Sequence, residues 1–420
     1  PESDGTHADY RRRMVERSWN SMLNFRFFEI TRESEQPPFL FAGSGKGSLV
    51  RGSEAFQLQA AVADGESSAG LERLLVEAER VERFGFTQSE LDRQKADMLR
   101  GYQRAWEERE KSESSTYAAE YGRAFLQGES FPGIEYEYAL ARRYIPGIEL
   151  DEVNRLGRRW ISDSSRVLLA ATPEKEGVEA PTEAELLAAF DAAAALSAEL
   201  TPWDDAGSDR PLLDEPPEGG SVVAETRHES VNVTEWRLSN GVRVLAKPTD
   251  FKSDQVLFSA RSPGGTSLAS DEEYVSATWA SSIVGASGAG EFSAVDIQKS
   301  LAGKAVSVSP FIGENEEGFS GSASPRDLEV LFQLISLYAT SPRRDETAFG
   351  SLMSRVQTAI ANRGTSPEAV WADTLSVVLA QGHPRRQPPT PERIESVNLD
   401  QALAFYADRF ADLGDFTFTF

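Results

Sequence analysis

Three histidines, His7, His228 and His383, are the only imidazoles in a chain of 420 residues. A hydrolytic zinc site needs two or three neutral imidazoles and a carboxylate, commonly with two histidines about four residues apart on one helical face. His7 stands near the first residue, His228 in a segment rich in acids and proline, and His383 between a glycine and a proline. No two of them can share a helix, so we expect surface histidines that hold no metal ion.

Other hydrolytic and nucleotide-binding chemistry is equally incomplete. A serine hydrolase would need one of the same histidines as its base, and no Gly-x-Ser-x-Gly sequence follows an expected strand. The lack of cysteine excludes disulfides, thiolate zinc sites and cysteine nucleophiles. Gly43–Ser48, with Lys46, resembles a phosphate loop, but the glycine that should stand four places before Gly-Lys-Ser/Thr is missing. We expect a flexible turn between two strands there.

The aromatic residues that recur at helical spacing are expected in the core rather than around a cofactor. They are Trp106, Tyr117, Tyr121 and Phe125.

Composition and charge limit the classes of partner that the chain could bind. Sixty-seven acids against 43 lysines and arginines give a net charge of -24, which repels phosphate backbones and argues against a nucleic-acid partner. An acidic, soluble surface is the simplest explanation, and attraction of basic peptides is the alternative. No apolar stretch approaches the roughly 18 to 20 residues of a membrane span, and no signal peptide is visible.

A break in composition divides the chain. Thr201–Ser230 holds four prolines, three glycines and eight acids, which predicts a solvated linker. Ala184–Leu200, just before it, is rich in alanine and predicts a helix. We therefore expect one domain at 1–200, an acidic linker at 201–230 and a second domain at 231–420.

The two parts repeat one order of elements. Phe56–Ala60 alternates like a half-buried strand, a helical stripe follows at Ala69–Val81, and a capping box of Thr87 and Glu90 opens a long helix. Matching segments recur at an offset of about 250 residues, which indicates a duplicated αβ unit. The matching pairs are Phe56–Ala60 with Phe319–Ala323, Ala69–Val81 with Arg326–Tyr338, the long helix with Phe349–Ile360, Gly128 with Gly382, Leu150 with Leu399, and Val167–Ala170, expected as a buried strand, with Thr417–Phe420.

The later part has additional strands in front of this unit. An Asn240-Gly241 turn opens the alternating run Gly241–Ala246, and a second run lies at Val256–Ala260. The earlier part lacks an equivalent, so we expect the chain to begin inside a domain. The predicted fold class is α+β, with tandem duplicated αβ units, each an antiparallel sheet flanked by helices in a two-layer arrangement.

Motifs in both parts carry a family resemblance. Trp19–Asn24 with Phe28–Ile30, followed by Pro37–Leu40, and then Ser89–Leu91 before the long helix, resemble the second domain of the insulinase-like zinc metallopeptidases (M16, the pitrilysin-type inverzincins). Leu238–Val244 resembles the opening of the domain that this family repeats. The resemblance spans nearly the whole chain. It implies a central fragment, the second and third of four αβ domains, from a bacterial zinc protease whose two halves close like a clamshell on an unfolded peptide.

The resemblance also implies where the chemistry of such an enzyme lies. The first domain of the family carries His-x-x-Glu-His, in which two imidazoles hold zinc, the glutamate is the general base, and a further carboxylate is a ligand. In the third domain the matching positions fall on Ala277, Ala280 and Ser281, a degenerate motif. The resemblance thus implies no catalytic, cofactor-binding or metal-ligating residue in this chain, and zinc only in a first domain outside it.

Three functions remain open from the sequence. The chain is a noncatalytic middle part of a zinc metalloendopeptidase that helps to form the substrate chamber, a catalytically inactive structural or binding homologue of the same fold, or an unrelated αβ protein. In the first case its partners are the remaining domains of the same polypeptide and peptide substrates, without nucleic acid. Because bacterial relatives are often exported, the periplasm is the preferred compartment.

Overall fold

The computed structural model describes residues 5–50, 52–162, 165–197, 199–205, 210–215 and 217–420. Backbone contacts divide the chain into two compact units, one of residues up to 31 with 37–206, the other of 32–36 with 207–420. Among the helices described, none is long and apolar enough to cross a lipid bilayer. Each unit combines helices with an open sheet, which confirms the predicted α+β class.

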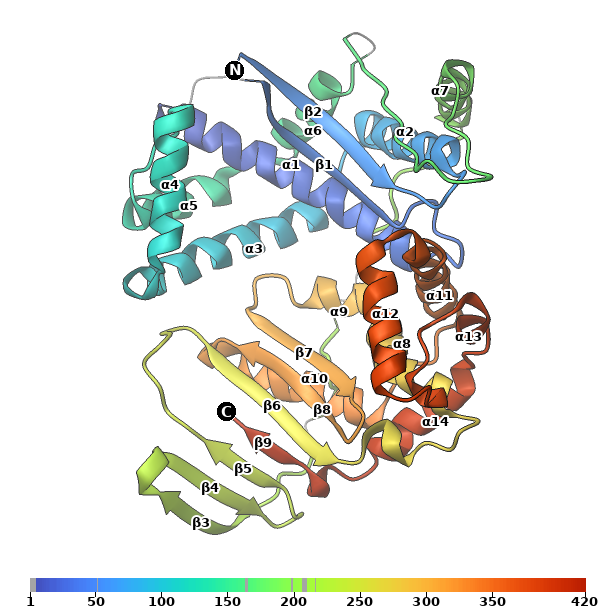
Figure 1. The fold of residues 1–420 in the computed structure, drawn as a ribbon. Helices are drawn as coiled ribbons and strands as arrows, with labels where there is room; N and C mark the ends of the chain where they lie inside the picture. The colour runs from blue at the N-terminus through green and yellow to red at the C-terminus, as the bar shows by residue number, and fades with distance from the viewer. Residues whose placement is uncertain (1–4, 51, 163–164, 198, 206–209, 216) are drawn as a thin grey trace. The chain divides into compact units, whose positions relative to one another are not determined.

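The first unit packs helices on a two-stranded antiparallel hairpin (Figure 1). The strand predicted at 56–60, the helix at 69–81 and the capping box at Thr87 are confirmed. Its elements in chain order are α1 (His7–Arg32), β1 (Phe41–Val50), β2 (Ser53–Ala61), α2 (Ser67–Phe84), α3 (Gln88–Glu107), α4 (Ser114–Gln127), α5 (Ile134–Tyr144), α6 (Leu150–Trp160) and α7 (Glu183–Ser197).

Aromatic side chains join the hairpin of the first unit to its helices. Trp19 of α1 is fully buried and meets Phe56 of β2, Phe86 and Trp160 edge-on, at centroid distances of 5.1, 5.7 and 5.1 Å. Phe56 and Trp160 are themselves stacked at 5.2 Å. Because aromatic rings bury large apolar areas, this cluster fixes α1 and the end of α6 on one face of the hairpin.

The turn predicted at Gly43–Ser48 is wrong, because this stretch is part of strand β1. Gly43 lies opposite Gln59 of β2, and the pairing continues in register through the whole stretch. Lys46 Nζ lies 2.7 Å from Glu16 Oε1, so its charge is already engaged. Glycine weakens a strand without preventing it, and the long partner strand decides the conformation.

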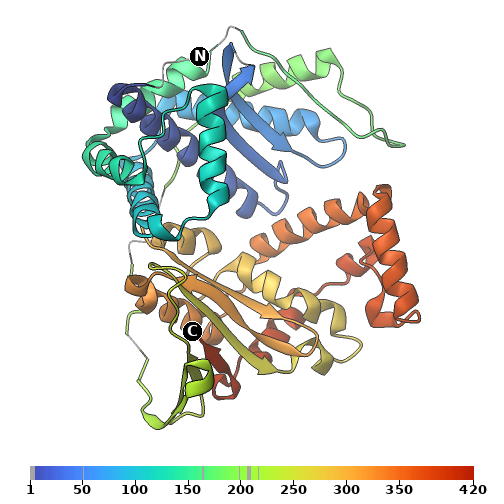
Figure 2. The same ribbon diagram turned by 60° about the vertical axis from the view of Figure 1, so that its left-hand side comes forward.

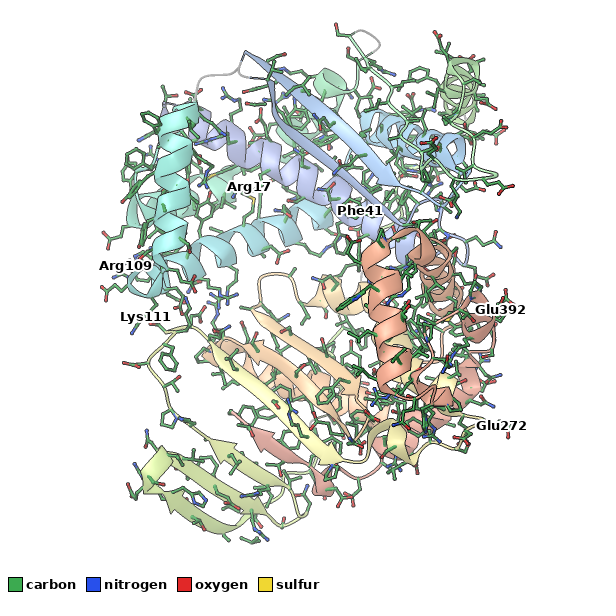
Figure 3. All side chains as sticks on the ribbon, in the orientation of Figure 1. Arg17, Phe41, Arg109, Lys111, Glu272 and Glu392 are labelled. Carbon is green, nitrogen blue, oxygen red and sulfur yellow. The ribbon has the colours of Figure 1, made fainter. Side chains whose placement is uncertain are left out.

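The core position predicted for most of the aromatic stripe is also wrong. A short 3-10 turn at Arg109–Lys111 separates α3 from α4 (Figure 3). On α4, Tyr117 and Tyr121 are exposed, and Phe125 is 88 % exposed. Of the four residues, Trp106 on α3 is partly buried. Its ring stacks on a tyrosine ring of α5 at a centroid distance of 5.4 Å. Helical spacing predicts a stripe, but it cannot predict whether another element covers that stripe.

The second unit is built on a sheet of seven described strands in the order β3-β4-β5-β9-β6-β8-β7, with α8 and α10 packed against β7 (Figures 1 and 2). Neighbouring strands are antiparallel except for β5 and β9, which are parallel. The elements are β3 (Val222–His228), β4 (Val233–Leu238), β5 (Arg243–Ala246), β6 (Val256–Pro263), α8 (Tyr274–Ser287), α9 (Ala294–Ser300), β7 (Val306–Ile312), β8 (Glu316–Ala323), α10 (Leu328–Thr340), α11 (Glu346–Ala361), α12 (Pro367–Leu379), α13 (Pro391–Glu395), α14 (Leu399–Arg409) and β9 (Thr417–Thr419).

The predicted order of repeated elements is confirmed for all members but one. In each unit a helix precedes a hairpin, and the hairpin leads into a series of helices in which Leu150 begins α6 and Leu399 begins α14. The aromatic contacts repeat as well, since Phe319 of β8 packs on Phe410 after α14 at 4.8 Å, as Phe56 of β2 packs on Trp160 at the end of α6. Sequence offset and side-chain packing therefore identify the same duplicated unit.

One member of the repeat differs. Val167–Ala170, predicted as a buried strand, lies in no strand, and Val167 and Leu169 are each 90 % exposed. Its counterpart β9 pairs with β5 on one side and β6 on the other. The described part of the first unit supplies neither neighbour, and a strand cannot form without a partner for its backbone groups.

The predicted linker is attached at both ends to the units beside it. In the first unit, Trp203 donates a hydrogen bond to Glu29 Oε2 at 3.1 Å, and Asp205 accepts one from Arg93 at 2.6 Å. In the second, Arg210 pairs with Glu291 at 2.6 Å, and β3 forms within the range predicted as linker. The boundaries 1–200, 201–230 and 231–420 stay a prediction.

A buried ion pair lies at the centre of the first unit. Arg26 of α1 donates to both oxygens of Glu90 on α3, at 2.7 and 2.8 Å, and to the Gly85 carbonyl at 3.1 Å. The guanidinium also lies 4.7 Å from the ring centroid of Phe86. Both charged side chains are almost fully buried, so each depends on the other for neutralisation.

We therefore expect Glu90→Gln to lower the free energy of unfolding of the first unit by about 3 kcal/mol, because the Arg26 charge would remain buried without a counter-ion. Glutamine keeps an acceptor for the capping box, so the effect reports the charge. Urea unfolding followed by hydrogen exchange of α3 amides measures it. The control is Asp151→Asn, in an exposed pair with Arg155, which should leave stability unchanged, and an equally small effect of Glu90→Gln would contradict the prediction.

Candidate functional site

The helix that carries the degenerate motif is a packing element of the second unit. Ala277 and Ala280 of α8 are fully buried on the same face as Ile283 and Val284, while Ser281 is partly buried. This helix packs against β7, α11 and α14. At two of the positions that the sequence alignment is expected to match with the zinc motif, the chain therefore has methyl groups inside the core.

The residue before the motif joins α8 to α14. The Ser276 hydroxyl donates to Gln401 Oε1 at 3.1 Å and accepts from the Asn398 backbone N–H at 3.0 Å. Asn398 is itself the N-cap of α14, with its side chain accepting from the Gln401 N–H. The helices α8 and α14 pack together, and the buried Ser276 hydroxyl satisfies polar groups at the start of α14.

A glycine turn before α8 is held by a buried carboxylate. Gly265 has a φ of 65°, and a Cβ at this position would lie 2.5 Å from the Gly313 carbonyl, so only glycine fits. Its N–H donates to the carboxylate of Glu317 in β8, which is 2 % exposed. Burial raises the pKa of Glu317 above the usual glutamate value, while the hydrogen bond from Gly265 and the charge of Arg409 act in the opposite direction.

The three histidines lie in separate elements and contact different groups. His7 Nε2, in the first turn of α1, lies 2.6 Å from the Tyr136 hydroxyl, and His228 Nε2, at the end of β3, lies 2.9 Å from Glu235 Oε2. His383 Nδ1 accepts from the backbone N–H of the residue two positions later. Hydrogen bonds from Arg243 and His228 lower the pKa of Glu235 to about 2. Among the residues described, no three side chains of His, Asp or Glu are grouped as metal ligands would be.

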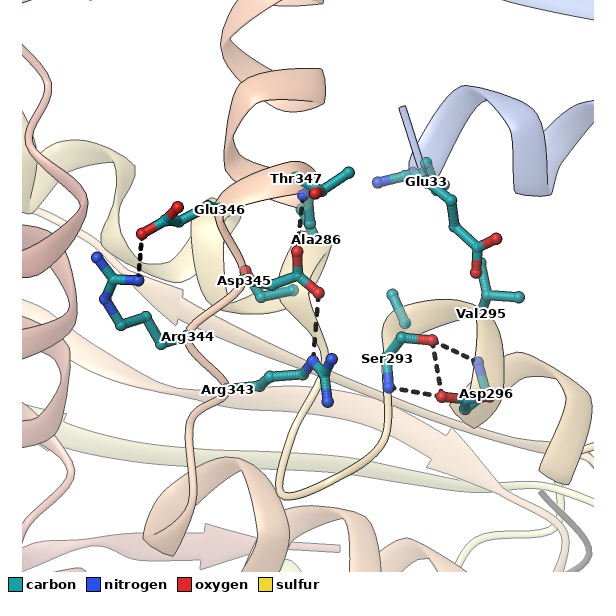
Figure 4. A pocket seen from close by; sticks show the side chains of 14 residues that line it. Glu33, Ala286, Ser293, Val295, Asp296, Arg343, Arg344, Asp345, Glu346 and Thr347 are labelled. Atoms are coloured by element: carbon teal, nitrogen blue, oxygen red, sulfur yellow. Dashed lines mark hydrogen bonds and ion pairs between the residues drawn. The ribbon is translucent and has the colours of Figure 1, made fainter. Parts of the chain in front are cut away.

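A polar pocket of about 670 Å³ lies at the carboxyl end of α8 and was not predicted (Figure 4). Four of its charged lining residues form two ion pairs, and the lining also includes Arg32 and Glu33. Arg343 lies 3.3 Å from Asp345, Arg344 lies 2.7 Å from Glu346, and Asp296 completes the cap of α9. No sequence pattern could have identified it, since its residues come from separate segments and form no recognisable spacing. The two ion pairs stabilise the loop, while burial raises the pKa of Glu33 above its usual value and lowers the pKa of Arg32.

The pKa of Glu317 gives a pH-dependent prediction. The native state binds this proton more tightly than the unfolded chain, so the free energy of unfolding falls as pH rises from the usual glutamate pKa to the raised one. Glu317→Gln, which keeps an acceptor for the Gly265 N–H, should remove this decrease. Urea unfolding of the second unit between about pH 4 and pH 8 measures the slope. An unchanged slope in the variant would show that Glu317 does not carry it.

Comparison with known proteins links this architecture to zinc proteases. A protein of Arabidopsis thaliana named zinc protease PQQL-like is 26 % identical over 415 residues, covering 98 % of this chain. A protein of Haemophilus influenzae named probable zinc protease PqqL is 23 % identical over 336 residues, covering 79 % of this chain. No family model matches the sequence.

Solved structures include the same fold. A structure of the ferredoxin protease FusC, in complex with Arabidopsis ferredoxin, covers all of this chain at 20 % identity with a TM-score of 0.59, and the match covers 46 % of FusC. The periplasmic protease PqqL of Escherichia coli covers 99 % of this chain at 18 % identity with a TM-score of 0.46, and the match covers 45 % of that protein. The chain spans 37 % and 35 % of the length of the two curated relatives. The resemblance to zinc proteases expected from the motifs is thus confirmed, and the chain is a homologue of the PQQL-like zinc proteases.

Proposed function

We propose that this chain is a noncatalytic portion of an insulinase-like zinc metalloendopeptidase. The observation that carries the proposal is the burial of Ala277 and Ala280 in the core of the second unit. Zinc needs nitrogen, sulfur or oxygen ligands at about 2.0 to 2.3 Å, and a methyl group offers none. Ser281 alone cannot complete a site, so the residues at the motif positions do not fit the metal.

We propose that the zinc site of the complete protein lies outside this chain. Similarity to curated zinc proteases over 98 % of the chain supports a peptidase as the parent protein, with zinc and the general base in another domain. This chain would then contribute to the wall of a chamber that holds a peptide substrate, and its partners would be the other domains of the same polypeptide. Its high negative charge would favour basic peptides at such a wall.

The second candidate is a structural or binding homologue of the same fold without peptidase activity. It is supported by the same observation, because a packing helix in place of a zinc helix suits either role. The two candidates differ in whether the complete polypeptide contains a His-x-x-Glu-His helix and hydrolyses peptides. A periplasmic location also belongs to the proposal, and fractionation of cells that produce the complete protein would test it.

The proposed function predicts how the chain behaves by itself. The 420-residue chain should bind no stoichiometric zinc and should cleave no peptide, because its α8 has no ligand set. Elemental analysis after dialysis against zinc and a quenched-fluorescent peptide library measure both properties. Peptide hydrolysis that survives repurification and is abolished by a chelator would overturn the proposal.

The proposed function also predicts how α8 responds to substitution at the three positions aligned with the zinc motif. Introducing the family motif with Ala277→His, Ala280→Glu and Ser281→His should lower the free energy of unfolding by at least about 3 kcal/mol and create no tight zinc site, because two of these side chains would enter a packed core. A matched control is Thr278→His with Ser282→His, which places two imidazoles four residues apart at exposed positions of the same helix. The control should keep its stability. A motif variant as stable as the control that binds one zinc ion would contradict the assignment of α8 as a packing helix.

A further inference from the structure

Two arginines of the second unit, Arg32 and Arg355, lie close together where the segment 32–36 meets α11. Arg32 is the last residue of α1, and residues 32–36 belong to the second unit. The segment lies against α11, since a Cβ at Gly350 would be 3.4 Å from the Cβ of Glu35. Arg355 follows on the same helix, and its guanidinium is close enough to Arg32 for the two positive charges to repel each other.

The guanidinium of Arg355 lacks a negatively charged partner among the residues that the structure describes. Its Nε donates to the Ser351 carbonyl oxygen at 3.3 Å, but its buried Nη2 has no described hydrogen-bond acceptor. Burial lowers the pKa of Arg355, the charge of Arg32 lowers it further, and no carboxylate acts in the opposite direction. A buried N–H without an acceptor commonly marks the place of a bound ion or water. Two neighbouring cations favour an anion at such a place.

The polar pocket beside Arg32 has room for an anion and for the molecule that carries it. Arg32 lines this pocket, as do Thr347 and Ala348 in the first turn of α11 (Figure 4). Ala348, Ser351 and Arg355 are spaced by three and four residues, so one face of α11 runs from the pocket to Arg355. The volume of about 670 Å³ is within the range of small-molecule sites.

The carboxylates that line the pocket do not supply the missing charge at Arg355. Two of them form the ion pairs described above, and Asp296 caps α9. Burial raises the pKa of Glu33, as do the charges of Asp296 and Asp345, so Glu33 binds a proton more readily than an ordinary glutamate. In its protonated form Glu33 is a hydrogen-bond donor, which suits an oxyanion.

We propose that a small polar molecule with an oxyanion group, a phosphate or a carboxylate, binds in this pocket with the oxyanion between Arg32 and Arg355. Guanidinium groups bind both kinds of oxyanion through charge-assisted and often bidentate hydrogen bonds. The inference uses residues of the second unit alone and does not depend on the proposed function.

Hydrogen exchange of the α11 amides, read by mass spectrometry, tests the site in the 420-residue chain. The probes are inorganic phosphate and N-acetyl-dialanine, whose free carboxylate separates a peptide end from a phosphate group. Sodium chloride keeps the ionic strength constant, and the amide of N-acetyl-dialanine is the uncharged control. At ten times its Kd, the bound oxyanion should slow this exchange about tenfold, because it stabilises the folded state by mass action.

Substitution of Arg355 separates an anion site from a packing role. Arg355→Gln should abolish protection by either oxyanion without lowering the free energy of unfolding of the free chain, because it removes an uncompensated charge. Arg355→Lys keeps the charge but loses the planar fork, so its affinity should lie between those of the unmodified chain and Arg355→Gln. The matched control is Arg237→Gln, which removes an exposed charge from β4 and should change neither property.

Three results overturn the proposal. The first is protection by neither oxyanion, or protection by the uncharged amide equal to that by the carboxylate. The second is equal protection in Arg355→Gln and in the unmodified chain. The third is a lower stability of Arg355→Gln than of Arg237→Gln in the absence of anions, because the guanidinium would then be a packing group.

Discussion

Backbone pairing of β6 is the interaction on which the second unit depends. This strand pairs with β8 over its whole length and with β9 on its other edge, so it links the hairpin β7–β8 to the strands β3, β4 and β5. A strand in this position satisfies the N–H and C=O groups of two neighbours at once. The ring of Phe258 on β6 stacks on the rings of Phe418 and Phe420 at centroid distances of 6.1 and 5.5 Å. The same strand therefore also contributes aromatic packing to the end of the chain. The first unit, with its two-stranded hairpin, relies on the cluster around Trp19 and on the pair of Arg26 and Glu90.

Local signals in the sequence predicted most of the elements because each rests on a few neighbouring residues. The capping box of Thr87 and Glu90 begins α3, and the Asn240-Gly241 turn, with a φ of 94° at Gly241, joins β4 to β5. Amphipathic stripes located α2 and α10 for the same reason, and the match to the long helix of the first part located α11. The offset of about 250 residues was predictable without any structure, because a duplicated unit keeps the order of its elements even where individual residues differ.

The predictions that were wrong have a common physical origin. In each case the conformation or burial of the segment depends on contacts with residues far away in the sequence. Gly43–Ser48 forms a strand because β2 pairs with it, and Val167–Ala170 does not form one because the described residues offer it no neighbour. The exposed aromatic residues of α4 belong to the same class, since a stripe becomes core only where another element covers it. At the candidate site, the motif alignment gave the positions Ala277, Ala280 and Ser281, but their burial and the support from Glu317 depend on tertiary packing that no local pattern encodes.

Burial restricts which side chains α8 can carry at Ala277 and Ala280. An ionisable side chain inside a core is tolerated only when a partner or a metal ion compensates its charge, so a histidine or glutamate at 277 or 280 would be costly without zinc. Small apolar residues remove that cost and let α8 approach α14 closely, with Ser276 bonded across the contact. The glycine turn and Glu317 serve the start of the helix, and this role does not depend on a metal ligand. The turn, the helix and the sheet of the second unit are thus held by packing and hydrogen bonds that do not require a bound metal ion.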